Sequence, residues 1–315
     1  MIMKKLLAFL LCFVTIFSLC ACGAPADKST ETPTEPTVDT SPLCDGKTLK
    51  MLVISSSFGM NTTNYLYEIA KDQGCTEVIV ARLFLAECTL RTHVANINGN
   101  AMAYTYQKRF CDEDWTVKQN ITMEYGIMDE DWDIIFLQHS AEGAAQADTY
   151  KDYIPKMISY IDSKKTNPNA RYVWNMTWAF PGDSTNKLFQ SLGADQMKHY
   201  ETIVAATQEH VVPVKEFAAI IPSGTAVQNA RTSKIGDTLN RDSMHLNSLG
   251  YIIAGLATYA TLTGKPIESV GISEFPASTY TSKYIITDEY KQIVIEAANA
   301  ALANPYQVTQ SAYTE

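Results

Sequence analysis

Short apolar runs alternate with helix-like segments along most of this chain. Five runs are each typical of a buried strand: 51–54, 77–81, 133–137, 171–176 and 210–214. Three segments between them have apolar residues at helical spacing: 61–73, 150–164 and 196–209. Strands that alternate with helices form a parallel sheet covered on both faces, so the pattern predicts an α/β domain.

The segment 101–123 breaks this alternation. Two strand-like stretches, 101–106 and 115–120, flank an acidic turn at 112–114, which predicts an inserted β-hairpin. Beyond the last apolar run, the residues 247–262 and 288–302 predict two closing helices. The chain shows no internal repeat.

The first residues have the composition of an export sequence. A short positive stretch precedes an apolar core at 6–19, and Cys22 follows a small-residue cleavage site. This resembles a bacterial lipoprotein signal, which implies a signal peptide at 1–21, lipidation of Cys22 and attachment to the extracytoplasmic face of the cell membrane. The alternative is an uncleaved transmembrane helix, but about 14 apolar residues are short for a bilayer that needs roughly 20.

The next segment, 22–46, is rich in Pro, Thr, Ser and acidic residues, and we interpret it as a disordered tether. The remaining residues, 47–315, are enough for one large domain, and 46% of the chain is hydrophobic. The formal net charge of −9 argues against nucleic acid as a partner. The sequence leaves the oligomeric state open.

Four cysteines remain downstream of Cys22, and they lie in a chain expected in an export compartment: Cys44, Cys75, Cys88 and Cys111. None has CxxC spacing, so disulfide pairing stays open, and small buried apolar residues are the simpler interpretation. We predict no metal site and no cofactor.

The residues 242–247 carry the strongest indication of chemistry. Asp242 and His245 are three positions apart, about one helical turn, so both side chains can face one spot. A histidine there can take a proton from a nucleophile while the aspartate holds its tautomer. Ser57 is the candidate nucleophile, because it follows the first buried strand in a small-residue turn, where open α/β sheets place their ligands.

Each of these residues also has a structural explanation. A serine in a turn after a strand is common, Asp242 can cap the helix that follows, and His245 can be a half-buried histidine without a catalytic role. The order and spacing of the three together favour a catalytic triad.

A first-strand serine with a late Asp-x-x-His resembles the SGNH/GDSL hydrolase superfamily. The blocks 54–58, 90–93, 132–138, 177–179 and 242–250 look most like a bacterial SGNH-like family of uncharacterised function. The resemblance implies a flavodoxin-like three-layer sandwich with a central, mostly parallel sheet, and a triad of Ser57, Asp242 and His245. The chain departs from the pattern, because Gly-Asp-Ser reads Ser-Ser-Ser at 55–57 and the second-block glycine has no clear equivalent in 85–89.

Three further residues are candidates for the site. The third-block asparagine is absent, so Gln138, at the end of a predicted strand, becomes the side-chain oxyanion donor beside the N–H of Ser57. His93 either approaches the site or caps a helix end, and Trp178 is either a substrate platform or a core residue. His139 is expected on the opposite face of the strand and is not assigned to the catalytic set.

We therefore expect a membrane-anchored serine esterase that removes small acyl groups, such as acetyl, from a carbohydrate or another small molecule. The ester preference rests on the resemblance and on the expected location. The competing hypothesis is an inactive binding lipoprotein that kept the fold and holds a glycan or solute.

Overall fold

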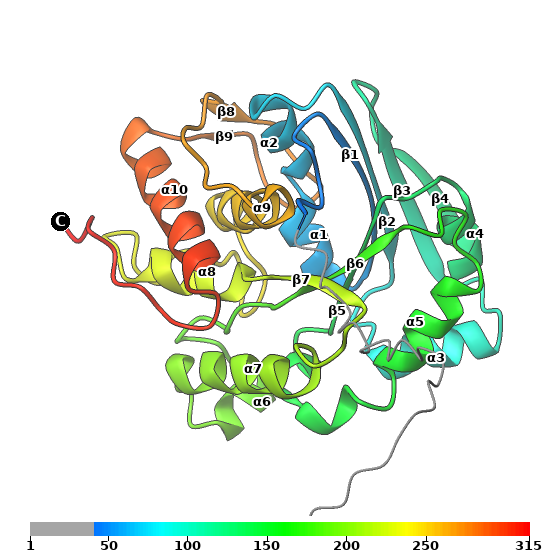
Figure 1. The fold of residues 1–315 in the computed structure, drawn as a ribbon. Helices are drawn as coiled ribbons and strands as arrows, with labels where there is room; N and C mark the ends of the chain where they lie inside the picture. Colours follow the sequence, from blue (N-terminus) through cyan, green and yellow to red (C-terminus); the bar gives the residue numbers. More distant parts are fainter. Residues whose placement is uncertain (1–40) are drawn as a thin grey trace, which may run out of the picture. The chain divides into compact units, whose positions relative to one another are not determined.

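A seven-stranded sheet forms the centre of the computed structural model, which describes residues 41–315 (Figure 1). The predicted signal peptide and Cys22 lie outside the described residues. The strands run in the order β4-β3-β2-β1-β5-β6-β7. Their bounds are β1 Thr48–Ser55, β2 Glu77–Phe84, β3 Tyr104–Phe110, β4 Thr116–Ile121, β5 Ile134–Gln138, β6 Arg171–Asn175 and β7 Phe217–Ile221.

Five of these strands are parallel: β1 pairs with β2 and β5, and β6 and β7 continue the ladder. The predicted hairpin is confirmed, since β3 and β4 are antiparallel to each other and β3 is antiparallel to β2. The hairpin therefore extends the sheet at its β2 edge. A separate two-stranded ribbon joins β8 (Glu274–Phe275) to β9 (Tyr284–Ile285).

Helices cover both faces of the sheet and complete the predicted three-layer sandwich. In Figure 1, α1, α2, α8, α9 and α10 lie on one side and α3, α5, α6 and α7 on the other. The bounds are α1 Ser57–Thr63, α2 Leu66–Asp72, α3 Leu90–Asn98, α4 Met123–Met128, α5 Ile154–Asp162, α6 Lys187–Ser191, α7 Gln196–His210, α8 Ser223–Arg231, α9 Ser248–Thr263 and α10 Asp288–Ala303. Two short 3₁₀ turns, Gly143–Ala145 and Ala147–Thr149, follow β5.

The central strands are apolar on both faces because both are covered. In β1, Met51 and Val53 pack into the core beneath α9, whereas Leu52 and Ile54 pack into the core on the opposite face. All four side chains are at most 1% exposed. This explains why the strand has a continuous apolar run in place of alternation.

The prediction of a strand at 210–214 is wrong. Helix α7 continues to His210, and the last strand of the sheet is Phe217–Ile221. Pro213 lies within the predicted run and has no N–H to donate to a ladder, which disfavours pairing there. Val211 is buried all the same, so its apolar character reflects core packing outside a strand.

The end of the predicted tether also differs from expectation, because the residues 41–46 pack against the domain. The Cys44 side chain is 5% exposed, and its backbone N–H donates to the carbonyl of Leu262 at 2.9 Å. Arg171 donates to the carbonyls of Ser41 and Pro42. The folded region therefore includes residues before position 47.

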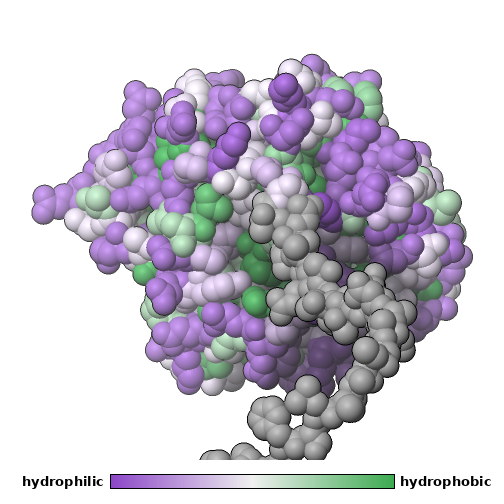
Figure 2. Space-filling model, in the orientation of Figure 1, coloured by the Kyte–Doolittle hydropathy of each residue, from purple (hydrophilic) through white to green (hydrophobic). Residues whose placement is uncertain are grey.

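The outer surface is mostly polar. Figure 2 shows hydrophilic side chains over most of one face, with smaller apolar patches between them. Within the part of the chain that the structure describes, no helix has the length and apolar character to span a bilayer.

Candidate active site

The first strand and the first helix place Ser57 at the carboxyl edge of the sheet. Strand β1 ends at Ser55, and α1 begins at Ser57, earlier than the start near position 61 that the sequence suggested. The turn is tight: a Cβ built on Gly59 would lie 2.0 Å from the Ser55 Oγ, so only glycine allows this approach. The close packing fixes the start of α1 directly above the end of the strand.

A capped turn positions Asp242 and His245. The Oδ1 atom of Asp242 accepts the backbone N–H groups of Met244 at 3.0 Å and His245 at 2.7 Å. Helix α9 begins only at Ser248, so the two side chains converge because the aspartate caps its own turn and not because they share a helix face. An antiparallel bridge between Asn240 and Leu246 closes the base of this loop.

The three predicted triad residues form one hydrogen-bonded chain. The Ser57 Oγ lies 2.9 Å from the Nε2 of His245, and the Nδ1 of His245 lies 2.9 Å and 3.0 Å from the two carboxylate oxygens of Asp242. A carboxylate can only accept, so it assigns the imidazole proton to Nδ1. The Nε2 atom then carries the lone pair that faces the hydroxyl proton of Ser57.

The surroundings of the triad keep His245 in the neutral state, in which its imidazole can accept a proton. Burial raises the pKa of Asp242, but the backbone N–H bonds from His245 and Met244 and the imidazole of His245 together outweigh it, and the pKa lies below its ordinary value. Burial lowers the pKa of His245, and the charge of Asp242 offsets this only in part. At neutral pH the aspartate is therefore charged and the imidazole neutral.

Trp178 is a packing residue here and not a substrate platform. It is 0% exposed, and its ring stacks on Phe58 with centroids 4.2 Å apart. Its Nε1–H donates to the carbonyl of Met244 at 2.9 Å, and Phe58 meets the His245 ring edge to face at 5.8 Å. The indole therefore supports the histidine loop from behind, because its position under α1 leaves no ring face open.

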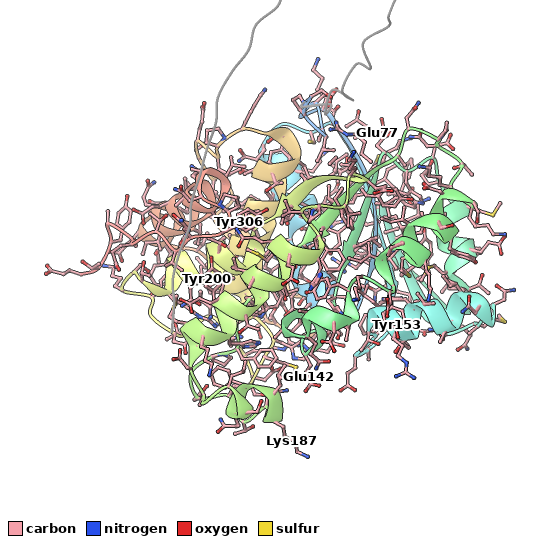
Figure 3. All side chains as sticks on the ribbon, turned by 60° about the horizontal axis from the view of Figure 1, so that its bottom comes forward. Glu77, Glu142, Tyr153, Lys187, Tyr200 and Tyr306 are labelled. Carbon is pink, nitrogen blue, oxygen red and sulfur yellow. The ribbon has the colours of Figure 1, made fainter. Side chains whose placement is uncertain are left out.

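A cavity of 590 Å³ opens beside the triad, within the range of about 300–1,000 Å³ for ligand pockets. Most of the residues that line it have polar side chains, and they come from the segments after β2 and β5, the start of α3 and the N-cap of α5. Besides Ser57 and His245 they include Glu87, Thr89, Arg91, Ser140, Glu142, Gln146, Thr149 and Tyr153. In Figure 3, Glu142 and Tyr153 both lie on the lower side of the molecule, away from Glu77 at the start of β2.

Gln138 is the last residue of β5, and its side chain is buried, at 2% exposed. Its Oε1 accepts from the Nδ2 of Asn175 at 3.0 Å, and its Nε2 is buried with no hydrogen-bond partner. The side chain is not among the residues that line the 590 Å³ cavity. Its role as oxyanion donor stays a prediction, and the unpartnered N–H₂ group is the observation that favours it.

The two histidines near the site are both buried and neutral. His93 is 1% exposed and pairs through Nδ1 with the Tyr104 hydroxyl at 2.9 Å, so the structure places it in the core and outside the cavity wall. Burial lowers its pKa to about 4. His139 does line the cavity, where it pairs through Nε2 with the Thr149 hydroxyl at 2.9 Å, and burial lowers its pKa to about 3.

Glu87 is a site residue that sequence reasoning missed. It lines the cavity in the left-handed conformation, with φ at 54°, in a turn that Cys88 N–H closes to the Leu85 carbonyl at 3.3 Å. Glycine usually occupies such a position. A glutamate thus has a backbone conformation typical of glycine on the cavity wall, which sequence spacing alone cannot reveal.

No three His, Cys, Asp or Glu side chains come together as a metal site within residues 41–315. The four cysteines downstream of Cys22 are all free thiols, and three of them are buried.

The fold and this edge define the class of the protein: an α/β three-layer sandwich that carries a Ser-His-Asp constellation at the carboxyl end of its parallel strands. The family model described as a domain of unknown function, DUF4886, matches residues 50–284, and the chain belongs to this family. A crystal structure of a DUF4886 family protein from Bacteroides uniformis ATCC 8492 is 32% identical, with a TM-score of 0.76 over 84% of this chain and 98% of that one.

Two enzymes of known structure are more distantly similar. An acetyl xylan esterase is 11% identical, with a TM-score of 0.40 over 67% of this chain and 98% of its own. A gut microbial diltiazem-metabolizing enzyme is also 11% identical, with a TM-score of 0.40 over 71% of this chain and 49% of its own. Likenesses this distant say nothing about activity. None of the curated proteins compared with the chain matches it.

Proposed function

We propose that this protein is a serine esterase of the SGNH type, anchored to the extracytoplasmic face of the membrane through Cys22, that removes small acyl groups from carbohydrate. The observation that carries the proposal is the 2.9 Å contact between the Ser57 Oγ and the His245 Nε2, with Asp242 on the other ring nitrogen. A hydroxyl, a neutral imidazole and a carboxylate in this order form an activated nucleophile.

The reaction is acyl transfer in two steps. The Ser57 Oγ attacks the ester carbonyl while its proton passes to His245 Nε2, and the imidazolium then protonates the departing alcohol as the ester C–O bond breaks. Water attacks the resulting acyl-serine, again giving its proton to His245, and the carboxylic acid leaves as Ser57 regains its proton. Asp242 stabilises the imidazolium in both steps and stays ionised throughout.

The oxyanion that forms in each step needs donors near Ser57. The backbone N–H of Ser57 belongs to the first turn of α1, where N–H groups have no acceptor within the helix. Gln138 Nε2 is the proposed side-chain donor. The turn at Glu87 is the candidate for a further backbone donor, because it lies on the cavity wall in a conformation typical of glycine.

The polar side chains on the cavity wall favour a hydroxylated alcohol as the leaving group of the substrate. Glu87, Arg91, Glu142 and Gln146 offer carboxylate, guanidinium and amide groups that pair with hydroxyls. Esters of acetylated sugars are accordingly the first substrates to screen.

A fluorophosphonate probe tests the nucleophile directly, since it reacts only with an activated serine. We expect labelling of the purified domain at Ser57, none in Ser57→Ala, and retained labelling in the matched variant Ser56→Ala, whose Oγ has no hydrogen-bond partner. Acetate release from acetylated sugars should follow the same pattern. An unlabelled wild-type domain would instead favour the alternative of an inactive glycan-binding lipoprotein.

The anchor has a separate test. Cys22→Ala removes the only residue proposed to carry the lipid, so the chain should leave the membrane fraction as a soluble or unprocessed form. A processed chain that stays on the membrane without Cys22 contradicts lipid attachment there and leaves the esterase proposal untouched.

A further inference from the structure

A second cavity, of 370 Å³, shares no lining residue with the first. Helices α1 and α2, the hairpin strands β3 and β4, and the segment 276–280 form its walls. Its volume falls within the range of about 300–1,000 Å³ for small-molecule sites. The proposed hydrolysis gives this cavity no role.

Two of the four aromatic rings that line this cavity each pack against a guanidinium group. The Arg82 guanidinium lies 4.0 Å from the ring centroid of Trp115, and that of Arg241 lies 4.7 Å from Tyr280. Arg82 is 4% exposed, and the hydroxyl and carbonyl of Thr63 hold it at 2.9 Å and 2.7 Å. Each ring thus has a cation on one face, and both rings keep accessible surface. Preordered rings lose little entropy when a ligand packs on them.

The charges that line the cavity cancel. Arg82 and Arg109 supply two positive charges, and Glu68 and Asp114 supply two negative ones. Arg109 and Glu68 already form an ion pair at 2.6 Å. This balance disfavours a strongly charged ligand, because neither sign gains an uncompensated partner.

Amide side chains add hydrogen-bonding capacity to the cavity wall. Asn64 and Gln107 line the cavity, and a side-chain amide both donates and accepts. A sugar has apolar C–H faces and a rim of hydroxyls. Flat aromatic rings can pack against its faces, and amide groups can donate hydrogen bonds to its hydroxyls and accept them. We propose that the second cavity is a binding site for a neutral sugar, held against the aromatic rings and hydrogen-bonded by Asn64 and Gln107.

One wall of this site supports the triad and must stay intact in any test. Asn61 accepts the backbone N–H of Leu246 at 2.9 Å through Oδ1 and reaches the Tyr251 hydroxyl with Nδ2. Arg241 also donates to Tyr251 and lies 3.5 Å from the Asp242 carboxylate. Substitution of these residues would disturb the His245 loop, so the informative positions are Gln107 and Tyr280.

Tryptophan fluorescence reports on this cavity in the intact domain. Trp132, Trp174 and Trp178 are at most 1% exposed, whereas Trp115 is partly exposed and lines the second cavity. The first cavity has no tryptophan in its wall. A sugar that binds only in the first cavity, beside Ser57, would therefore contact no accessible tryptophan and should leave the fluorescence unchanged.

The experiment titrates cellobiose and N,N′-diacetylchitobiose, and separately digalacturonate, into the Ser57→Ala domain. We expect the neutral sugars to change the fluorescence saturably, with affinity about five- to tenfold weaker in Gln107→Ala and in Tyr280→Ala. Ile285→Ala is the matched control, since Ile285 is 70% exposed in a nearby segment and outside the cavity. It should bind as Ser57→Ala does.

Three results would overturn the inference: no saturable change with any of the sugars, tighter binding of digalacturonate than of the neutral sugars, or unchanged affinity in both Gln107→Ala and Tyr280→Ala. Because Ser57 is absent from the titrated chain, none of these outcomes depends on the proposed esterase activity. A domain that fails to hydrolyse esters can still confirm the sugar site.

Discussion

Replacement of Gln138 by methionine separates a catalytic role from a structural one. Gln138→Met nearly conserves side-chain volume and removes both polar atoms from a position that is 2% exposed. The structural consequence is the loss of one neutral hydrogen bond, from Asn175 Nδ2 to the Gln138 Oε1. Asn175 Nδ2 keeps a second acceptor, the Thr62 hydroxyl at 3.1 Å, so it does not become an orphaned donor.

The two roles predict effects of different size on different quantities. Loss of one neutral buried hydrogen bond lowers the free energy of unfolding by about 1 kcal/mol, a shift in Tm of about 2–4 °C for a domain of this size. Loss of an oxyanion donor lowers kcat by about 10²–10³-fold, or about 3–4 kcal/mol in the barrier. We expect both effects, because the Nε2 of Gln138 is buried and unpartnered in the absence of an oxyanion.

The assay is steady-state hydrolysis of the best acetylated sugar, with thermal unfolding measured on the same preparations. Asn175→Leu is the control, because it breaks the same hydrogen bond from the other side, together with the bond to Thr62, and leaves the Gln138 amide in place. That control should lower Tm with kcat within a few-fold of the wild type. If Gln138→Met also turns over near the wild-type rate, Gln138 is not the donor, and a backbone N–H in the Glu87 turn replaces it.

Three further predictions concern ionisation and cooperation. Ser57→Ala and His245→Ala should each lower kcat by several orders of magnitude, and the double variant should be little worse than either single one. If the losses in barrier free energy add in the double variant, the two residues do not act as one catalytic unit. Because burial lowers the pKa of His245, the acid limb of kcat/KM should have its midpoint below the ordinary value of 6.5, and a midpoint above it would contradict a neutral base. His93 and His139 have pKa values of about 4 and about 3 when folded, so the unfolded chain binds more protons as pH falls below 6.5. The stabilisation from the neutral histidines should be fully present above that pH and should be lost as the pH falls through the folded pKa values, by at most about 3 kcal/mol for His93. Urea unfolding midpoints of the wild type and of His93→Gln across this pH range test the prediction.

Local patterns in the sequence determined the elements and the chemistry of the candidate triad. The apolar runs at 51–54 and 133–137 predict buried parallel strands because burial on both faces leaves no polar position. The acidic turn at 112–114 predicts the hairpin for a similarly local reason. The order and spacing of Ser57, Asp242 and His245, through the resemblance that they carry, pointed to one site, although only Ser57 follows a strand.

Tertiary structure decided which side chains face the cavity and which are covered. Trp178 follows β6 and His93 lies in α3, yet α1 covers the indole and the Tyr104 side chain contacts the imidazole, so neither residue lines the cavity beside Ser57. Sequence spacing carries no information on such covering, because it depends on elements far away in the chain. The sequence does not predict the left-handed backbone of Glu87 either. The turn between β2 and α3 imposes a conformation that glutamate does not prefer by itself, and only the packed fold holds it there.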